Sequence, residues 1–191
     1  GDPNSDSVTG LTSVYDATQT EGRGVFMIDM KSGKVLARKV LDSAATDAQT
    51  ELEYATVMTP AVFDLNGDSF ADLVMVGDLG GRVFKWVVSD LGGDPVNGTE
   101  PGDDVDQPNW PFKLFFQAPV GTVSGDSFYQ NFFTAPTAAL NGGKLWVAFG
   151  AGEREHLPYE GESGTTAEND RFYVVFDPDP YERLATPLPT V

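Results

Sequence analysis

Short runs of apolar residues, each ended by glycine, asparagine or aspartate, indicate a chain built from β-strands joined by turns. The most informative stretch is residues 59–90, which read TPAVFDLNGDSFADLVMVGDLGGRVFKWVVSD. Two apolar runs, residues 60–63 and 73–76, flank a polar loop, and a third run, residues 83–88, follows a glycine pair that suits a tight turn. This stretch therefore predicts three successive strands with a long loop between the first two.

The same pattern continues on both sides of this stretch. Residues 24–29 and 34–40 predict a hairpin whose turn, residues 30–33, ends in a glycine, and a second glycine pair, residues 142–143, predicts another tight turn. Further strands are predicted at residues 110–116, 132–140, 144–150 and 171–177, and polar surface connections at 41–54, 91–109 and 120–131. Aromatic residues fall within these strands, and we expect Trp86, Trp110, Phe115, Phe116, Trp146 and Tyr173 to pack in the core.

The middle and the last third of the chain repeat one another. Residues 59–61, 74–77 and 83–88 correspond in order to residues 135–137, 147–150 and 172–176, and residues 24–28 resemble the third strand of a preceding unit. Repeated sets of short strands are typical of a β-propeller, in which each unit is one four-stranded blade. The alternative is a β-sandwich, which has similar strands without this repeated order.

The predicted fold class is therefore all-β, with β-propeller blades and a cation-binding loop between two strands. Closed propellers have roughly 4–8 blades, whereas two fairly complete units and one hairpin are recognisable, so we expect a partial propeller or part of a larger one. We expect a flexible or partial-strand segment at residues 1–23, the blades at residues 24–177, and a tail at residues 178–191.

The composition of the chain is strongly acidic. There are 29 Asp and Glu residues against 12 Lys and Arg, which gives a formal charge of −17. This charge repels nucleic acid and anionic membrane surfaces and favours cations. No apolar run approaches the roughly 20 residues that span a bilayer, so we expect neither nucleic-acid binding nor membrane insertion. The absence of cysteine rules out disulfides and thiolate chemistry.

The loop DLNGDSFAD, residues 64–72, has the spacing of a calcium-binding loop. Acidic and amide side chains at its first, third and fifth positions can direct several oxygens at one cation, and calcium takes about six to eight oxygen ligands. Gly67 allows the tight turn between two of these ligands. The candidate ligands are Asp64, Asn66, Asp68, the Phe70 carbonyl and Asp72.

This loop departs from an EF-hand in three ways. Ser69 occupies the sixth position, where an EF-hand has glycine, and Met75 occupies the twelfth, where it has a bidentate glutamate. Strands instead of helices are predicted on either side. We therefore expect a calcium site that links two strands, and the alternative is a solvated acidic turn.

No catalytic group stands out. The one histidine, His156, follows three charged residues and is predicted to be solvated. Ser127 and Ser163 lack the G-x-S-x-G pattern of a nucleophile. Gly150 and Gly152 lack the third glycine of a dinucleotide fold and predict a tight turn. The prediction is a protein that is not an enzyme, with no catalytic residue and no organic cofactor.

Four stretches together resemble a known family. They are VFMIDMKSG at residues 25–33, the loop DLNGDSFAD, the block VGDLGGRVFKW at residues 76–86, and a series that runs from Ala135-Pro136 through Phe149-Gly150-Ala-Gly152 and Phe172-Tyr173 to Asp177. In this order they are similar to the C-terminal propeller of the type IV pilus tip-associated adhesins, the PilY and PilC proteins. The resemblance covers most of residues 24–177.

This resemblance implies an extracellular, pilus-associated protein of the bacterial cell surface that supports pilus assembly, adhesion and twitching. Its partners would be pilus subunits (minor pilins) or other parts of a larger parent protein. The resemblance implies Ca²⁺ as the cofactor, with the ligands carried over to Asp64, Asn66, Asp68, Phe70 (carbonyl) and Asp72.

Two other families share parts of the pattern. FG-GAP and VCBS repeats, which form extracellular binding propellers, have the same DxNGD loop but repeat it in several blades, and here it occurs once. Quinoprotein dehydrogenase propellers, which are enzymes, share the turn from Asp29 to Gly33. They place a tryptophan eight residues after that aspartate, where this chain has Ala37.

Overall fold

The protein is all-β throughout the part of the chain that the computed structural model describes, which comprises residues 22–40, 52–88, 110–123, 126–152 and 171–181. Its regular elements are eleven strands, with no helix among these residues, and so none that could cross a membrane. The strands are β1 (Gly24–Ile28), β2 (Val35–Val40), β3 (Ala61–Phe63), β4 (Leu73–Gly77), β5 (Arg82–Val87), β6 (Phe112–Gln117), β7 (Gly121–Val123), β8 (Asp126–Phe128), β9 (Thr137–Asn141), β10 (Lys144–Ala151) and β11 (Arg171–Asp177).

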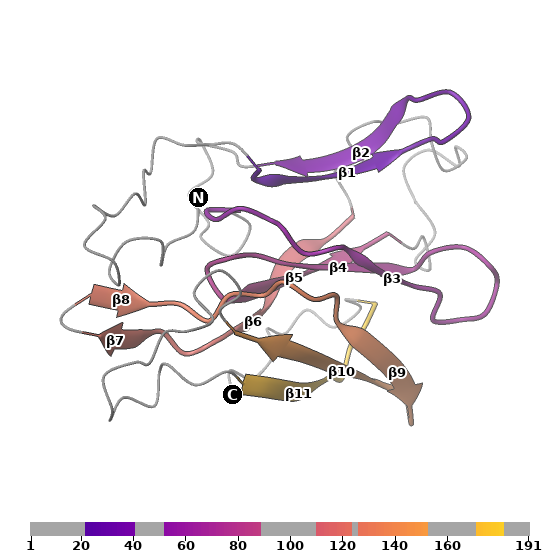
Figure 1. The fold of residues 1–191 in the computed structure, drawn as a ribbon. Coiled ribbons are helices and arrows are strands. Elements are labelled where there is room, and N and C mark those ends of the chain that lie inside the picture. The colour runs from indigo at the N-terminus through magenta and orange to yellow at the C-terminus, as the bar shows by residue number, and fades with distance from the viewer. Residues whose placement is uncertain (1–21, 41–51, 89–109, 124–125, 153–170, 182–191) are drawn as a thin grey trace.

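These strands form three stacked antiparallel sheets and one separate hairpin, β7–β8. Sheet 1 is β1–β2, sheet 2 has the order β3-β4-β5-β6, and sheet 3 has the order β11-β10-β9. Sheet 2 lies between the other two (Figure 1), and a hydrophobic cluster fills each of the two interfaces. A stack of antiparallel sheets is consistent with propeller blades, and the described residues do not close a ring.

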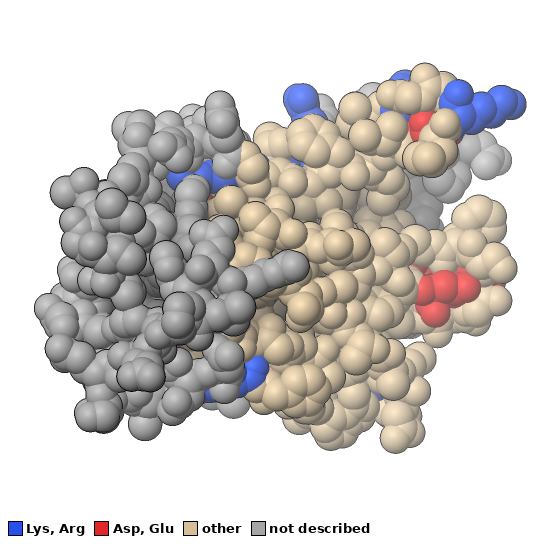
Figure 2. Space-filling view, in the orientation of Figure 1, with Lys and Arg blue, Asp and Glu red and all other residues tan. Residues whose placement is uncertain are grey.

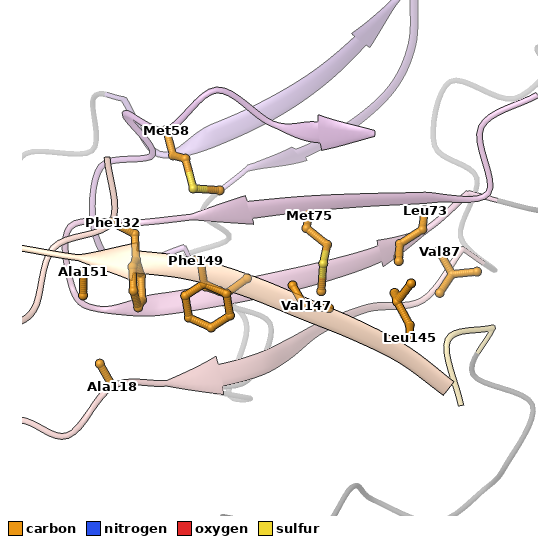
Figure 3. Packing of buried hydrophobic residues seen from close by; sticks show 11 residues of the cluster. Met58, Leu73, Met75, Val87, Ala118, Phe132, Leu145, Val147, Phe149 and Ala151 are labelled. Atoms are coloured by element: carbon orange, nitrogen blue, oxygen red, sulfur yellow. The ribbon is translucent and has the colours of Figure 1, made fainter. Parts of the chain in front are cut away.

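Both faces of sheet 2 are covered, so every residue of β4 and β5 is buried. Successive side chains of a strand point to opposite faces. Val74 and Val76 accordingly pack toward sheet 1, whereas Leu73 and Met75 pack toward sheet 3. Figure 3 shows the second of these interfaces, in which side chains of β4 and β5 meet Leu145, Val147 and Phe149 of β10.

Strand pairing reproduces the internal repeat that the sequence predicts. In sheet 2 the residue opposite Met75 is Lys85 on one side and Ala61 on the other. The corresponding residue of sheet 3, Ala148, lies opposite Val174 and Thr137. These partners are the positions that the sequence alignment of the two units equates. Sheets 2 and 3 are therefore two copies of one unit in register.

The turn between β4 and β5 explains the sequence GDLGGR. The Asp78 carboxylate is buried and accepts hydrogen bonds from the Gly80 and Arg82 backbone N–H groups and from Arg82 Nε, at 2.9–3.0 Å. Burial raises the pKa of the Asp78 carboxyl, while the charge of Arg82 acts in the opposite direction. Gly80 must be glycine because an added Cβ would lie 2.0 Å from the Tyr54 ring, and Gly81 has φ +75°.

A buried ion pair joins sheets 2 and 3. Lys85 Nζ of β5 lies 2.6 Å from Asp177 Oδ2 at the end of β11, and it also donates to the Asp179 carbonyl at 3.1 Å. Both charged side chains are almost completely buried. A buried charge is tolerated when a partner and further hydrogen bonds satisfy it, so this pair fixes how the two sheets align.

Some sequence predictions were wrong in detail. Residues 120–131, predicted as a loop, contain the β7–β8 hairpin, whose three-residue strands are too short to show a periodic pattern. β9 begins after Pro136, which cannot donate a ladder hydrogen bond, and not at Phe132. The predicted turn at Gly150 is wrong because this residue lies inside β10. Trp146 was expected in the core but is 43% exposed on the outer face of sheet 3.

Candidate metal centre

The loop that carries the predicted calcium ligands connects β3 to β4 at one end of sheet 2. Asp64 directly follows β3 and Asp72 directly precedes β4. The last residue of β3 pairs with the first of β4, and the Asp72 N–H donates to the Phe63 carbonyl at 2.9 Å, which brings the two ends of the loop together. Figure 2 shows a group of acidic side chains at the end of the molecule where this loop lies.

Asp72 anchors the base of the loop. Its side chain is buried, and Oδ2 accepts hydrogen bonds from the backbone N–H groups of Leu65 at 2.6 Å and Asn66 at 3.2 Å. The sequence identified Asp72 only as a candidate ligand and did not reveal this anchoring role. The carboxylate therefore stabilises the loop whether or not a cation is bound.

Asp64 organises the exposed tip of the loop. Oδ1 accepts a hydrogen bond from the Gly67 N–H at 2.7 Å, and Oδ2 accepts one from the Ser69 N–H at 2.8 Å. The hydrogen bond from Ser69 is the main reason that the pKa of the Asp64 carboxyl is lowered, and desolvation opposes it. The loop thus favours the ionised carboxylate, which is the form that binds a cation.

Asn66 and Asp68 complete the polar tip. Asn66 Oδ1 accepts the Asp68 N–H and Asp68 Oδ1 accepts the Phe70 N–H, both at 2.8 Å. The two side chains also meet directly, since Asn66 Nδ2 donates to Asp68 Oδ2 at 2.9 Å. Local bonds of this kind hold a polar turn in shape without a helix or a ladder.

The backbone of the loop is left-handed at two positions. Gly67 has φ +80° and Ser69 has φ +75°, and Ser69 is the only non-glycine residue with positive φ among the described residues. Ser69 occupies the sixth position of the loop, where an EF-hand uses glycine for its sharp turn. The sequence identified this substitution but gave no sign that serine adopts the conformation usually reserved for glycine.

The chemistry of the donor set fits calcium, because three carboxylates, one amide oxygen and one backbone carbonyl are all hard oxygen donors. The side-chain geometry alone does not form a metal cluster, since no three His, Cys, Asp or Glu residues in the described ranges lie close enough to hold an ion. The amide of Asn66 and the Phe70 carbonyl would have to contribute. Calcium binding by Asp64, Asn66, Asp68, Phe70 and Asp72 therefore stays a prediction.

The remaining sequence candidates are His156, Ser163, Ser127 and Gly152. His156 and Ser163 lie outside the described residues, and Ser127 lies in β8. Gly152 follows β10, where its N–H donates to the Asn131 carbonyl at 3.0 Å.

Comparison with solved structures supplies a structural relative for this chain. No family model matches the chain, and no curated protein sequence matches it significantly. Among solved structures the chain is similar to the C-terminal domain of PilY1 from Pseudomonas aeruginosa, with a TM-score of 0.51 and 19% sequence identity. The match covers 83% of this chain but only 32% of the PilY1 chain. At this identity the likeness establishes the fold, so the described chain has the fold of about a third of the PilY1 C-terminal domain.

Proposed function

We propose that this protein is a calcium-binding, noncatalytic surface module of a type IV pilus tip adhesin or pilus biogenesis factor. In this role it supports pilus assembly, adhesion and twitching at the bacterial cell surface. Its partners are pilus subunits (minor pilins) or other parts of a larger parent protein.

The observation that supports this proposal most directly is the structural likeness to the PilY1 C-terminal domain. Four short stretches of the amino-acid sequence, between residues 25 and 177, indicate the same family on their own. Together they favour the pilus family over the integrin-like and quinoprotein alternatives, which share only a single loop or a single turn with this chain. The match spans about a third of the PilY1 chain. The activity of the whole protein to which this chain would belong is therefore proposed as well.

In the proposed function the β3–β4 loop is the cation site. Asp64, Asn66 and Asp68 supply side-chain oxygens at the tip, and the Phe70 carbonyl and Asp72 complete the set. A bound cation would neutralise three carboxylates that lie within nine residues of one another. The chain's own contribution is to hold these groups between the paired ends of β3 and the fully buried β4, which limits the entropy lost on binding.

Isothermal titration calorimetry tests the metal site. Wild-type protein should bind one Ca²⁺, magnesium should compete poorly because it demands octahedral geometry at shorter distances, and Asp68→Ala should abolish binding. Asp29→Ala is the matched control, since Asp29 is also an aspartate that accepts backbone hydrogen bonds in a turn, here from Lys31 and Ser32. Unchanged affinity in Asp68→Ala would remove this loop as a calcium site.

A genetic experiment tests the pilus role separately. The Asp64→Ala/Asp68→Ala double variant, placed in the natural gene, should reduce pilus-dependent adhesion and twitching, whereas Asp29→Ala should not. Normal pilus function in a strain whose purified protein has lost calcium binding would contradict the proposed pilus role of the loop. It would not contradict the assignment of the loop as a calcium site.

A further inference from the structure

The outer face of sheet 3 carries a stripe of exposed apolar side chains. Phe172, Val174 and Phe176 alternate along β11 and are 71%, 57% and 47% exposed. Trp146 of β10 lies opposite Phe176, with the two ring centroids 5.5 Å apart, and the Lys144 ammonium lies 5.0 Å from the Phe176 ring centroid. Contiguous exposed apolar surface of this kind marks an interaction site.

The internal repeat shows what these positions do in the neighbouring unit. Through the shared register, Phe172, Val174 and Phe176 of β11 correspond to Val83, Lys85 and Val87 of β5. The three β5 residues are almost completely buried, because sheet 3 packs on that face of sheet 2. The same face of the same unit is thus covered in sheet 2 and uncovered in sheet 3.

The stack also has a direction. We call the face that carries Phe84 and Trp86, or their equivalents, face A, and the opposite face B. Face B of sheet 2 meets face A of sheet 3, whose corresponding residues are Tyr173 and Val175. Face A of sheet 2 meets Val25 and Met27 of sheet 1. Each interface therefore joins a B face to an A face, as in a head-to-tail contact.

The opposite end of the stack agrees with this direction. Residues 25–28 of β1, VFMI, align with residues 83–86 of β5, VFKW, so Phe26 corresponds to Phe84 and Ile28 to Trp86. Phe26 and Ile28 are 53% and 49% exposed, whereas Phe84 and Trp86 are buried. Sheet 1 therefore exposes an A face and sheet 3 exposes a B face.

We propose that face B of sheet 3 is a docking surface for the A face of another antiparallel sheet of the same repeat, supplied by the longer natural polypeptide. Three sheets are fewer than the roughly four that close a propeller. The structural relative is about three times as long as the matched span, since the chain covers 32% of it. The occupant presents alternating aromatic and aliphatic side chains, as Tyr173 and Val175 do toward sheet 2. The proposal is independent of calcium and of the pilus role.

Cysteine accessibility tests this proposal, because the chain contains no cysteine and a single introduced thiol gives a clean signal. Val174→Cys is made in the 191-residue chain and in the natural full-length polypeptide, and the rate of maleimide labelling is measured in both. We expect labelling at least about tenfold slower in the full-length protein, because a covered thiol reacts only when the structure opens. Met30→Cys, at a turn residue that is 95% exposed, should label rapidly in both.

Several results would overturn the proposal. These are equal labelling of Val174→Cys in the two proteins, a natural gene that ends at Val191, and slow labelling in the isolated chain. In the last case, labelling that becomes fast on dilution would identify a second copy of the chain as the occupant, and labelling that stays slow would identify other residues of this chain. Phe172→Cys provides the same comparison if Val174→Cys does not fold, as judged by circular dichroism.

Discussion

Strands β5 and β11 occupy the same place in two copies of one structural unit, yet their surroundings differ. Every residue of β5 is buried, whereas exposed and half-buried residues alternate along β11 until the buried Asp177. β5 pairs with strands on both sides and has a sheet on each face, while β11 is an edge strand with one face uncovered.

The burial of a strand in this fold therefore depends on which sheets pack against it and not on the strand's own sequence pattern. A strand with apolar residues on both faces is stable in solution only if two neighbours cover it. Each repeat contacts only its neighbours, so the central unit contributes most to the stability of this chain. Substitutions at equivalent positions of different units should consequently have very different effects.

Phe84→Ala and Phe26→Ala compare equivalent aromatic positions in sheets 2 and 1. Phe84 is completely buried and stacks on Phe112 with centroids 5.2 Å apart, so its loss should reduce the free energy of unfolding by about 3–5 kcal/mol. Phe26 is half exposed, and its loss should reduce the free energy of unfolding by less than about 1 kcal/mol. Urea denaturation measures both, and similar effects would show that sheet 1 does not end the stack as described.

Asp177→Asn removes one partner of the buried ion pair. The buried Lys85 ammonium would then lose this carboxylate partner, which should reduce stability by about 3 kcal/mol or more. Val174→Lys is the matched control, because Val174 is the equivalent of Lys85 but is exposed, and it should change stability by less than about 0.5 kcal/mol. A large loss of stability in Val174→Lys of the isolated chain would show that the outer face of sheet 3 is not exposed to solvent.

Calcium should stabilise the β3–β4 hairpin of sheet 2 and leave the equivalent β9–β10 hairpin of sheet 3 unchanged. Sheet 2 has the acidic loop there, whereas sheet 3 has a two-glycine turn at Gly142 and Gly143. At a free calcium concentration about 100 times Kd, binding should raise the free energy of unfolding by about 2.7 kcal/mol. Hydrogen exchange should slow at the β3–β4 loop and not at the β9–β10 turn. Equal protection of both turns would argue against a specific site.

Ser69→Gly tests the left-handed residue of the loop. A non-glycine residue in this conformation is strained by about 1–2 kcal/mol, and glycine removes that strain. Glycine also increases the conformational entropy of the unfolded chain, which lowers the stability of the folded protein by about 0.4–1 kcal/mol. We expect a gain in stability of less than about 1 kcal/mol. Gly143→Ala, at φ +76° in the equivalent hairpin, should lower the stability of the protein instead. Thermal denaturation compares them, and destabilisation by Ser69→Gly would contradict the strain.

The smallest effect concerns the pH dependence of the loop. The pKa of Asp64 is lowered in the folded protein, so its contribution to stability is fully present above the ordinary value of 3.8 and is lost as the pH falls through the folded pKa. Titration of the calcium-free protein by NMR should show Asp64 below 3.8, and Asp64→Asn should remove that transition. An ordinary pKa for Asp64 would show that the Ser69 and Gly67 hydrogen bonds do not persist in solution.

Local chemistry allowed much of the fold to be predicted from the sequence alone. Glycine pairs located the β4–β5 and β9–β10 turns because those turns require positive φ, at Gly81 in the first and at both Gly142 and Gly143 in the second. Short apolar runs ended by turn residues located most of the strands, and the recurrence of these runs gave the unit that the strand registers reproduce. The spacing of Asp64, Asn66, Asp68 and Asp72 likewise identified the candidate cation loop, because it depends only on residues close in sequence.

Only the tertiary structure decided which apolar faces are covered and which polar groups pair. Lys85 and Asp177 are 92 residues apart, and nothing local to either shows that they meet. Trp146 and Trp86 both lie in apolar runs, yet only Trp86 is buried, because sheet 1 covers it and no described residue covers Trp146 to the same extent. Strand patterning depends on neighbouring residues along the chain, whereas burial depends on which sheet packs against which.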